Sequence, residues 1–181
     1  MNDASNIFQA LLEKDRCPIA VAKKGVPPLP GYYAIFVDSP KSLPKTYGSF
    51  LEKRRTCLLY IGIATKSLLQ RLIEQDMEHK HPSTFFRGIA PILGFRPPIG
   101  SLVERRNQNN YFFSKDDTLQ IVEWLEKHLF VSWVQDSSTQ KQVESEIIKL
   151  NRPLLNTQHN PDKLEALAQL RKECRMIAMM R

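Results

Sequence analysis

Cysteine is scarce in this sequence of 181 residues, and long hydrophobic runs are missing altogether. Cys17, Cys57 and Cys174 lie far apart and show no CxxC or Cys/His ligand spacing, which excludes a disulfide framework and a typical zinc site. No segment approaches the ~18 consecutive apolar residues of a membrane-spanning helix, and the N-terminus has no signal-peptide pattern. We therefore expect a soluble, unprocessed cytoplasmic protein with no membrane partner.

Basic residues outnumber acidic ones. The chain has 26 Lys and Arg against 19 Asp and Glu, which gives a net charge of +7 and a pI of about 9.4. Such a balance favours a polyanionic partner such as nucleic acid, although a merely basic soluble protein has the same composition.

Two short apolar segments organise the chain. Residues 31–37 (GYYAIFV) and 58–63 (LLYIGI) have strand composition, and each carries a tyrosine close to a glycine. As neighbouring strands they would bring Tyr33 and Tyr60 towards one surface. Successive strand side chains alternate between faces, so Tyr32 should point away from Tyr33 and serve in packing.

The connection between these strands, residues 38–56, contains two prolines and one glycine and is interpreted as a long exposed loop. Its basic cluster, Lys53, Arg54 and Arg55, is a candidate phosphate contact. Residues 96–110 are irregular and rich in Arg, Asn and Gln, so we interpret residues 96–113 as an insertion loop in which Arg105 and Arg106 are further candidates.

Periodicity and capping patterns predict helices in the rest of the chain. They are expected over residues 6–14, from Ser67, over residues 85–95 with an end near Gly94, from Ser114, from Thr139 to Pro153, and from Asn160 to the C-terminal region. A third strand is expected over residues 129–134.

Four motifs occur in a fixed order: Gly31-Tyr32-Tyr33, Tyr60-Ile61-Gly62, Arg71 on the following helix, and Glu144 on a helix that leads to Pro153-Leu-Leu-Asn156. Together they resemble the GIY-YIG nuclease superfamily over roughly residues 31–156. Two departures are visible. Tyr32 stands where the family usually has isoleucine or valine, and the spacing from Gly62 to Arg71 is one residue longer than expected, which a longer turn through Thr65 and Lys66 would absorb.

The resemblance implies an α/β fold with a small, mainly antiparallel three-stranded sheet flanked by helices. We expect one domain over residues 1–181, with a nuclease core at 31–156 and helical extensions at 1–30 and 157–181. The oligomeric state stays open.

The implied function is a metal-dependent endonuclease that hydrolyses DNA phosphodiester bonds, in restriction and defence or in DNA repair and recombination. Glu144 would hold one Mg²⁺ or Mn²⁺ ion, which suits a hard cation that takes oxygen ligands and keeps several waters. Tyr33 would take a proton from water, because a nearby cation and arginine favour the ionised phenol. Tyr60 would orient that water or the phosphate, Arg71 would stabilise the transition state, and Asn156 would position the site.

Additional candidates are less firmly placed. Arg87 is the rival of Arg71, and His79, His81 and Lys66 are alternatives for a base or a phosphate ligand, although each histidine is more readily interpreted as a surface residue. The alternative function is a catalytically silent nucleic-acid-binding module on the same fold. The filled motif positions favour the enzyme.

Overall fold

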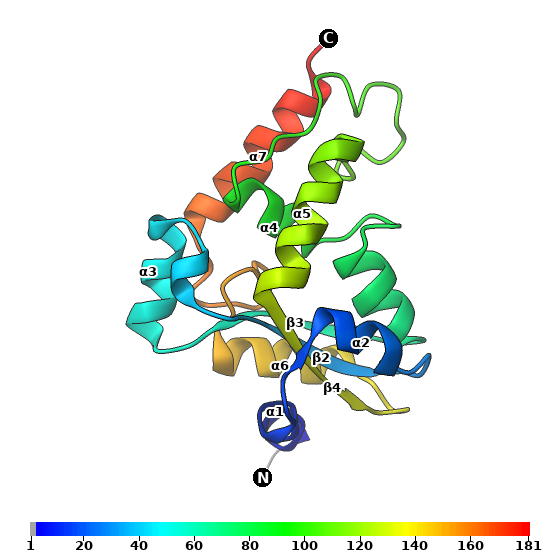
Figure 1. Cartoon of the computed structure of the whole chain (residues 1–181), viewed down its shortest axis with the longest axis vertical. Coiled ribbons are helices and arrows are strands. Elements are labelled where there is room, and N and C mark those ends of the chain that lie inside the picture. The colour runs from blue at the N-terminus through cyan, green and yellow to red at the C-terminus, as the bar shows by residue number, and fades with distance from the viewer. Residues whose placement is uncertain (1–2) are drawn as a thin grey trace.

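A four-stranded antiparallel sheet forms the centre of the molecule, with the strand order β1-β4-β2-β3 (Figure 1). In the computed structural model, which describes residues 3–181, its long strands are β2 (Gly31–Val37), β3 (Leu58–Ala64) and β4 (Leu129–Gln135). The predicted α/β fold with three antiparallel strands is thus confirmed. A fourth strand, β1 (Cys17–Pro18), adds two residues at the β4 edge and was not expected from the sequence.

Helices cover both faces of the sheet (Figure 1). One face carries α1 (Asp3–Glu13) and α6 (Lys141–Asn151). The other carries α2 (Ile19–Gly25), the helix η2 (Leu69–Met77) and α5 (Lys115–His128). Two further helices, α4 (Phe86–Ile92) and α7 (Glu165–Met179), pack against each other at the end of the molecule away from the N-terminus.

The alternation of side chains along β2 divides the two tyrosines between the faces. Tyr32 lies in the apolar cluster beneath α1 and α6, and Tyr33 lies in the larger cluster on the opposite face. The backbone N–H of Gln140 donates to the Tyr32 hydroxyl (2.7 Å), which ties β2 to the start of α6. Tyr32 therefore has the packing position that strand geometry predicts.

The predicted loop over residues 38–56 is wrong. This segment contains a 3₁₀ helix, η1 (Pro40–Ser42), and a ten-residue helix, α3 (Lys45–Arg54). Leu43 and Leu51 are buried in the core, and their burial stabilises this segment. The prolines and basic residues, which indicated a loop, are outweighed by these core contacts.

Helix starts were predicted correctly where a serine caps the helix. The N–H of Gln70 donates to Ser67 Oγ (3.1 Å), and that of Asp117 donates to Ser114 Oγ (3.0 Å). Thr139 does not cap α6, because the N-cap is Gln140 and makes no side-chain cap hydrogen bond.

The last helix also begins later than predicted. Its N-cap is Leu164 rather than Asn160. The buried Asn160 amide instead donates to the carbonyls of Pro153 (2.7 Å) and Asn156 (3.0 Å). Asparagine often caps helices, but Asn160 instead stabilises the turn that carries Asn156.

The helix after β3 has π winding, in which hydrogen bonds span five residues rather than four. At its end the N–H of Glu78 donates to Ile73 O (2.9 Å). Such winding fits more residues into each turn and is frequent at functional sites. In this helix the Arg71 side chain reaches Asp76, five residues further along the chain.

Within residues 3–181, no helix is long and apolar enough to cross a membrane. The three cysteines are free thiols.

Residues 96–113 contain no helix or strand, and this loop passes close to α7 before α5 begins (Figure 1).

Candidate active site

The glycines of the two strand motifs lie where neighbouring atoms leave no room for a side chain. In the β2–β3 ladder Tyr33 pairs with Gly62, and a Cβ atom at Gly62 would overlap the Tyr33 ring and hydroxyl. A Cβ at Gly31 would overlap the backbone oxygen of Val134. Both glycines are thus required by close approach.

Tyr33 belongs to a buried polar cluster with Arg71, Asp76 and Ser83. The Tyr33 hydroxyl donates to Asp76 Oδ2 (2.5 Å), while Arg71 Nη1 and Ser83 Oγ both donate to Asp76 Oδ1 (2.5 Å each). Asp76 is fully buried. One carboxylate therefore binds together a strand, the π-helix and the segment before α4.

Asp76 was not selected from the sequence. It falls within the apolar stripe of its helix, between Leu72, Ile73 and Met77. An unpaired buried charge is costly, so a carboxylate in a buried stripe requires a partner. The position of Asp76 in the stripe was therefore the signal from which the sequence could have identified it as a site residue.

The ionisation expected of Tyr33 depends on a bound cation, because the protein alone does not favour it. Burial, followed by the neighbouring Asp76 carboxylate, raises the pKa of Tyr33 well above its ordinary value, although Arg71 opposes this. Burial likewise raises the pKa of Tyr60. Burial lowers the pKa of Arg71, but neighbouring acidic groups, among them Asp76 with its hydrogen bond, outweigh this and raise it, so Arg71 stays charged. Without a bound cation both tyrosines are neutral phenols.

An open pocket of about 550 Å³ lies beside this cluster. Tyr60, Glu144 and Asn156 line it, so the structure brings together three of the five predicted site residues around one space. Tyr33 lies directly behind, with its ring centroid 6.3 Å from that of Tyr60. The pocket wall also contains residues that the sequence did not single out, among them Lys141, His159 and Arg171.

Asn156 is held against the outer edge of β3. Its Oδ1 accepts from the N–H of Ile61 (3.0 Å) and its Nδ2 donates to Ile61 O (2.9 Å), while the N–H of Leu155 donates to Leu59 O (2.8 Å). The asparagine side chain thus pairs with an edge strand as a backbone would. These hydrogen bonds fix the pocket wall at Asn156, and its role in catalysis stays a prediction.

Glu144 is a half-buried carboxylate from the first turn of α6. Burial raises its pKa to about 7, against the opposing effects of Arg71, a hydrogen bond from the N–H of Ile63, and Lys141. No Lys, Arg or His lies within ion-pair distance of it among residues 3–181. Glu146 does not line the pocket.

A single hard cation fits this donor set. No group of three or more His, Cys, Asp or Glu side chains within the described part of the chain could hold a metal ion. One carboxylate beside an open pocket of about 550 Å³ suits a hydrated ion such as Mg²⁺, which keeps several waters and is completed by substrate phosphate.

The two candidate arginines have different positions. Arg71 points into the buried cluster at Asp76. Arg87 donates to Ser83 O (3.2 Å), to the carbonyl of Asn109 and to the side chain of Asn110, so it holds the insertion loop. Neither is among the residues that line the Glu144 pocket, whereas Arg171 is.

The remaining candidates do not line this pocket either. His79 is not a surface residue: it is buried and stacked on Phe86, with ring centroids 3.9 Å apart, and burial lowers its pKa to about 4. His81 and Lys66 are exposed. Lys66 lacks the desolvation that a lysine base needs.

The basic clusters are divided between structural and exposed positions. Arg54 donates to the carbonyls of Arg152 (2.8 Å) and Asp162 (3.0 Å), so it ties α3 to the turn after α6. Arg105 lies over the Phe112 ring, with 5.0 Å from its Cζ to the ring centroid. Lys53, Arg55 and Arg106 are exposed.

The arrangement as a whole defines a small α/β catalytic domain, in which two glycine-tyrosine strands, a glutamate helix and an edge-binding asparagine surround one pocket. A family model of the GIY-YIG catalytic domain matches residues 31–173, and the chain belongs to this family of nucleases. Searches of curated proteins and of solved structures gave no significant match. The matched region reaches beyond Asn156 and includes most of α7.

Proposed function

We propose that this protein is a divalent-cation-dependent endonuclease that hydrolyses DNA phosphodiester bonds in the pocket of Tyr60, Glu144 and Asn156, in restriction and defence or in DNA repair and recombination. The supporting observation is that a carboxylate and a phenol face one open space whose wall also carries Lys141 and Arg171. Phosphodiester hydrolysis needs an oriented water and positive charge around the phosphate, and these side chains supply both.

Glu144 is the residue that would hold Mg²⁺ or Mn²⁺. Burial raises its pKa against the opposing effects of Arg71 and Lys141, and a bound cation would favour the ionised form. A divalent ion at this position supplies charge neutralisation for the phosphate and lowers the pKa of nearby water. Nucleases of this family generally use divalent metal ions.

In this proposal, one arginine contacts the phosphate inside the pocket and another acts from behind the tyrosines. Arg171 lines the pocket and contacts the phosphate directly. Arg71 remains bound to Asp76 behind the tyrosines and contributes its permanent charge to the site from there. Lys53, Arg55, Arg105 and Arg106 contact more distant phosphates.

Water activation falls to the residues that reach the pocket. The Tyr60 hydroxyl orients the attacking water, and Asn156 holds the β3 edge on which Tyr60 is carried. Tyr33 positions this assembly through Asp76, because its hydroxyl is directed at that carboxylate. The water proton passes to His159, which lines the pocket and whose imidazole is the side chain most often used as a general base.

The test is nicking of supercoiled plasmid by purified protein with Mg²⁺ or Mn²⁺ and with EDTA. Wild type should nick only with the cation, and Glu144→Ala should lose the activity. Glu146→Ala, two positions along α6 and outside the pocket, is the matched control and should retain it. Wild type that binds plasmid without nicking would establish the silent binding module, and equal nicking by wild type and Glu144→Ala would refute the assigned site.

A further inference from the structure

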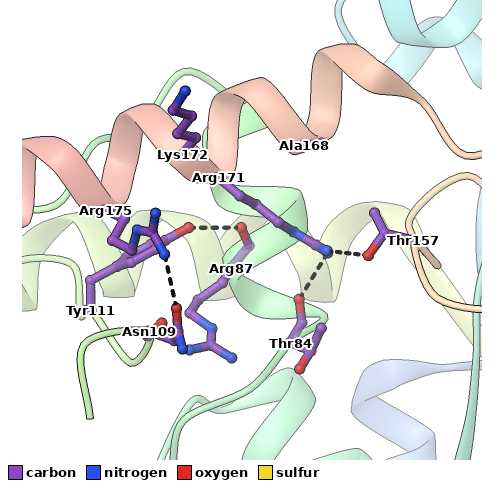
Figure 2. A pocket seen from close by; sticks show the side chains of 9 residues that line it. All are labelled: Thr84, Arg87, Asn109, Tyr111, Thr157, Ala168, Arg171, Lys172 and Arg175. Carbon is purple, nitrogen blue, oxygen red and sulfur yellow. Dashed lines mark hydrogen bonds between the residues drawn. The ribbon is translucent and has the colours of Figure 1, made fainter. Parts of the chain in front are cut away.

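A second pocket, of about 410 Å³, lies between α4, α7 and the loop before α5. Its lining contains four basic residues, Arg87, Arg171, Lys172 and Arg175, and no carboxylate. Figure 2 shows Arg171 extending from α7 towards Thr157 and Thr84, with Arg175 beside Tyr111 and Asn109. The pocket thus concentrates positive charge around one hollow.

These charges lack compensation by the protein itself. Within residues 3–181, none of the four basic side chains forms an ion pair with a carboxylate. Arg171 is fixed in place by hydrogen bonds to Thr157 Oγ1 (2.9 Å), Thr84 O (3.3 Å) and Leu155 O (3.2 Å), and its Nε atom is buried with no hydrogen-bond partner. Arg87 and Arg171 are half-buried, Lys172 and Arg175 are exposed, and a bound anion would stabilise such a group of cations with an unsatisfied donor.

The basic pocket adjoins the catalytic pocket. Thr84, Asn109, Thr157 and Arg171 line both of them. An anion in the basic pocket therefore lies next to the position of the scissile phosphate. In a nucleic acid strand, the anion next to one phosphate is the phosphate of the neighbouring nucleotide.

We propose that the basic pocket binds a neighbouring phosphate of the same DNA strand, so that α7 completes the substrate site. Arg175 contacts this phosphate, Arg171 lies between it and the scissile phosphate because it lines both pockets, and Arg87 and Lys172 add charge around it. Tyr111 and Ala168 line the same pocket and offer an apolar surface to the sugar. This inference rests on the proposed action on DNA and gives α7 a substrate contact outside the strand motifs.

The first test uses thymidine 3′,5′-bisphosphate, which carries two phosphates on one nucleoside and has no diester to cleave. In Mg²⁺ it should displace a fluorescent oligonucleotide at about tenfold lower concentration than thymidine 3′-monophosphate or 5′-monophosphate, because it alone fills both pockets. Arg175→Ala and Lys172→Ala should each reduce this advantage. Lys24→Ala removes the same charge from an exposed residue that lines neither pocket, and should keep it.

Equal displacement by the bisphosphate and the monophosphates, or an undiminished advantage in Arg175→Ala, would overturn the proposal. The salt dependence of duplex binding is the second test: Arg175→Ala should lower the slope of log K against log salt by about 1. A bisphosphate advantage with an unchanged slope would assign the pocket to free nucleotides and refute the strand contact. Because neither test requires cleavage, failure of nicking and failure of this inference are distinguished.

Discussion

Asp76 is the residue whose removal should most clearly reveal how the site is built. It is fully buried and accepts hydrogen bonds from Tyr33, Arg71 and Ser83. Asp76→Asn preserves the shape but removes the charge, which leaves the Arg71 guanidinium without its counter-ion. Breaking a buried ion pair in this way costs about 3–5 kcal/mol. Because 26% of the Arg71 side-chain surface is exposed, we expect the low end, about 3 kcal/mol.

The assay is urea and thermal unfolding of the purified variants. A loss of about 3 kcal/mol should lower Tm by about 6–12 °C in a chain of this length. Asp15→Asn, at an exposed position, is the matched control and should change stability by less than about 0.5 kcal/mol. The double variant Arg71→Met/Asp76→Asn removes both charges and should be about 1–2 kcal/mol more stable than Asp76→Asn alone. Asp76→Asn with wild-type stability, or strictly additive effects in the double variant, would refute the reasoning.

Three other predictions concern the two strands and the pocket. In a urea titration, Gly62→Ala should lower the unfolding free energy by about 1–3 kcal/mol, because the new Cβ overlaps the Tyr33 ring. The control Gly25→Ala, whose Cβ meets only Trp133 at 3.9 Å, should lower it by less than about 1 kcal/mol. In EDTA, the Tm of wild type should fall relative to that of Glu144→Gln as pH rises from about 4.5 to about 7, because the folded-state pKa of Glu144 is raised. Parallel curves of Tm against pH for the two proteins would contradict this. Tyr60→Phe should lower the single-turnover nicking rate by about 10²-fold, whereas Tyr47→Phe, outside both pockets, should leave the rate unchanged. A Tyr60→Phe rate equal to that of wild type would exclude the Tyr60 hydroxyl from the reaction.

Local patterns in the sequence were sufficient for much of the fold. The alternation along residues 31–37 placed Tyr32 and Tyr33 on opposite faces, and Ser67 and Ser114 marked two helix starts, because these features depend on neighbouring residues alone. Residues 45–54 were missed because a few long-range core contacts, such as that of Leu51, outweigh a polar and proline-containing composition.

The site was predictable in its motifs but not in its arrangement. The motifs led to Tyr60, Glu144 and Asn156, which line one pocket, and their roles there stay predictions. The partner of Tyr33 was missed, because the position of Asp76 in an apolar stripe shows that its carboxylate needs a partner but not which residue across the fold supplies it. Arg171 lines the pocket from α7, a distant helix that packs on α4.

The most direct measurement of the central claim is a crystal structure with Mn²⁺ and a short DNA that carries an uncleavable phosphate analogue. Anomalous scattering should place the Mn²⁺ ion about 2.1 Å from a Glu144 carboxylate oxygen, and a phosphate should lie in the pocket beside Tyr60 and Arg171. An ion and a phosphate bound away from Glu144 and Tyr60 would contradict the account.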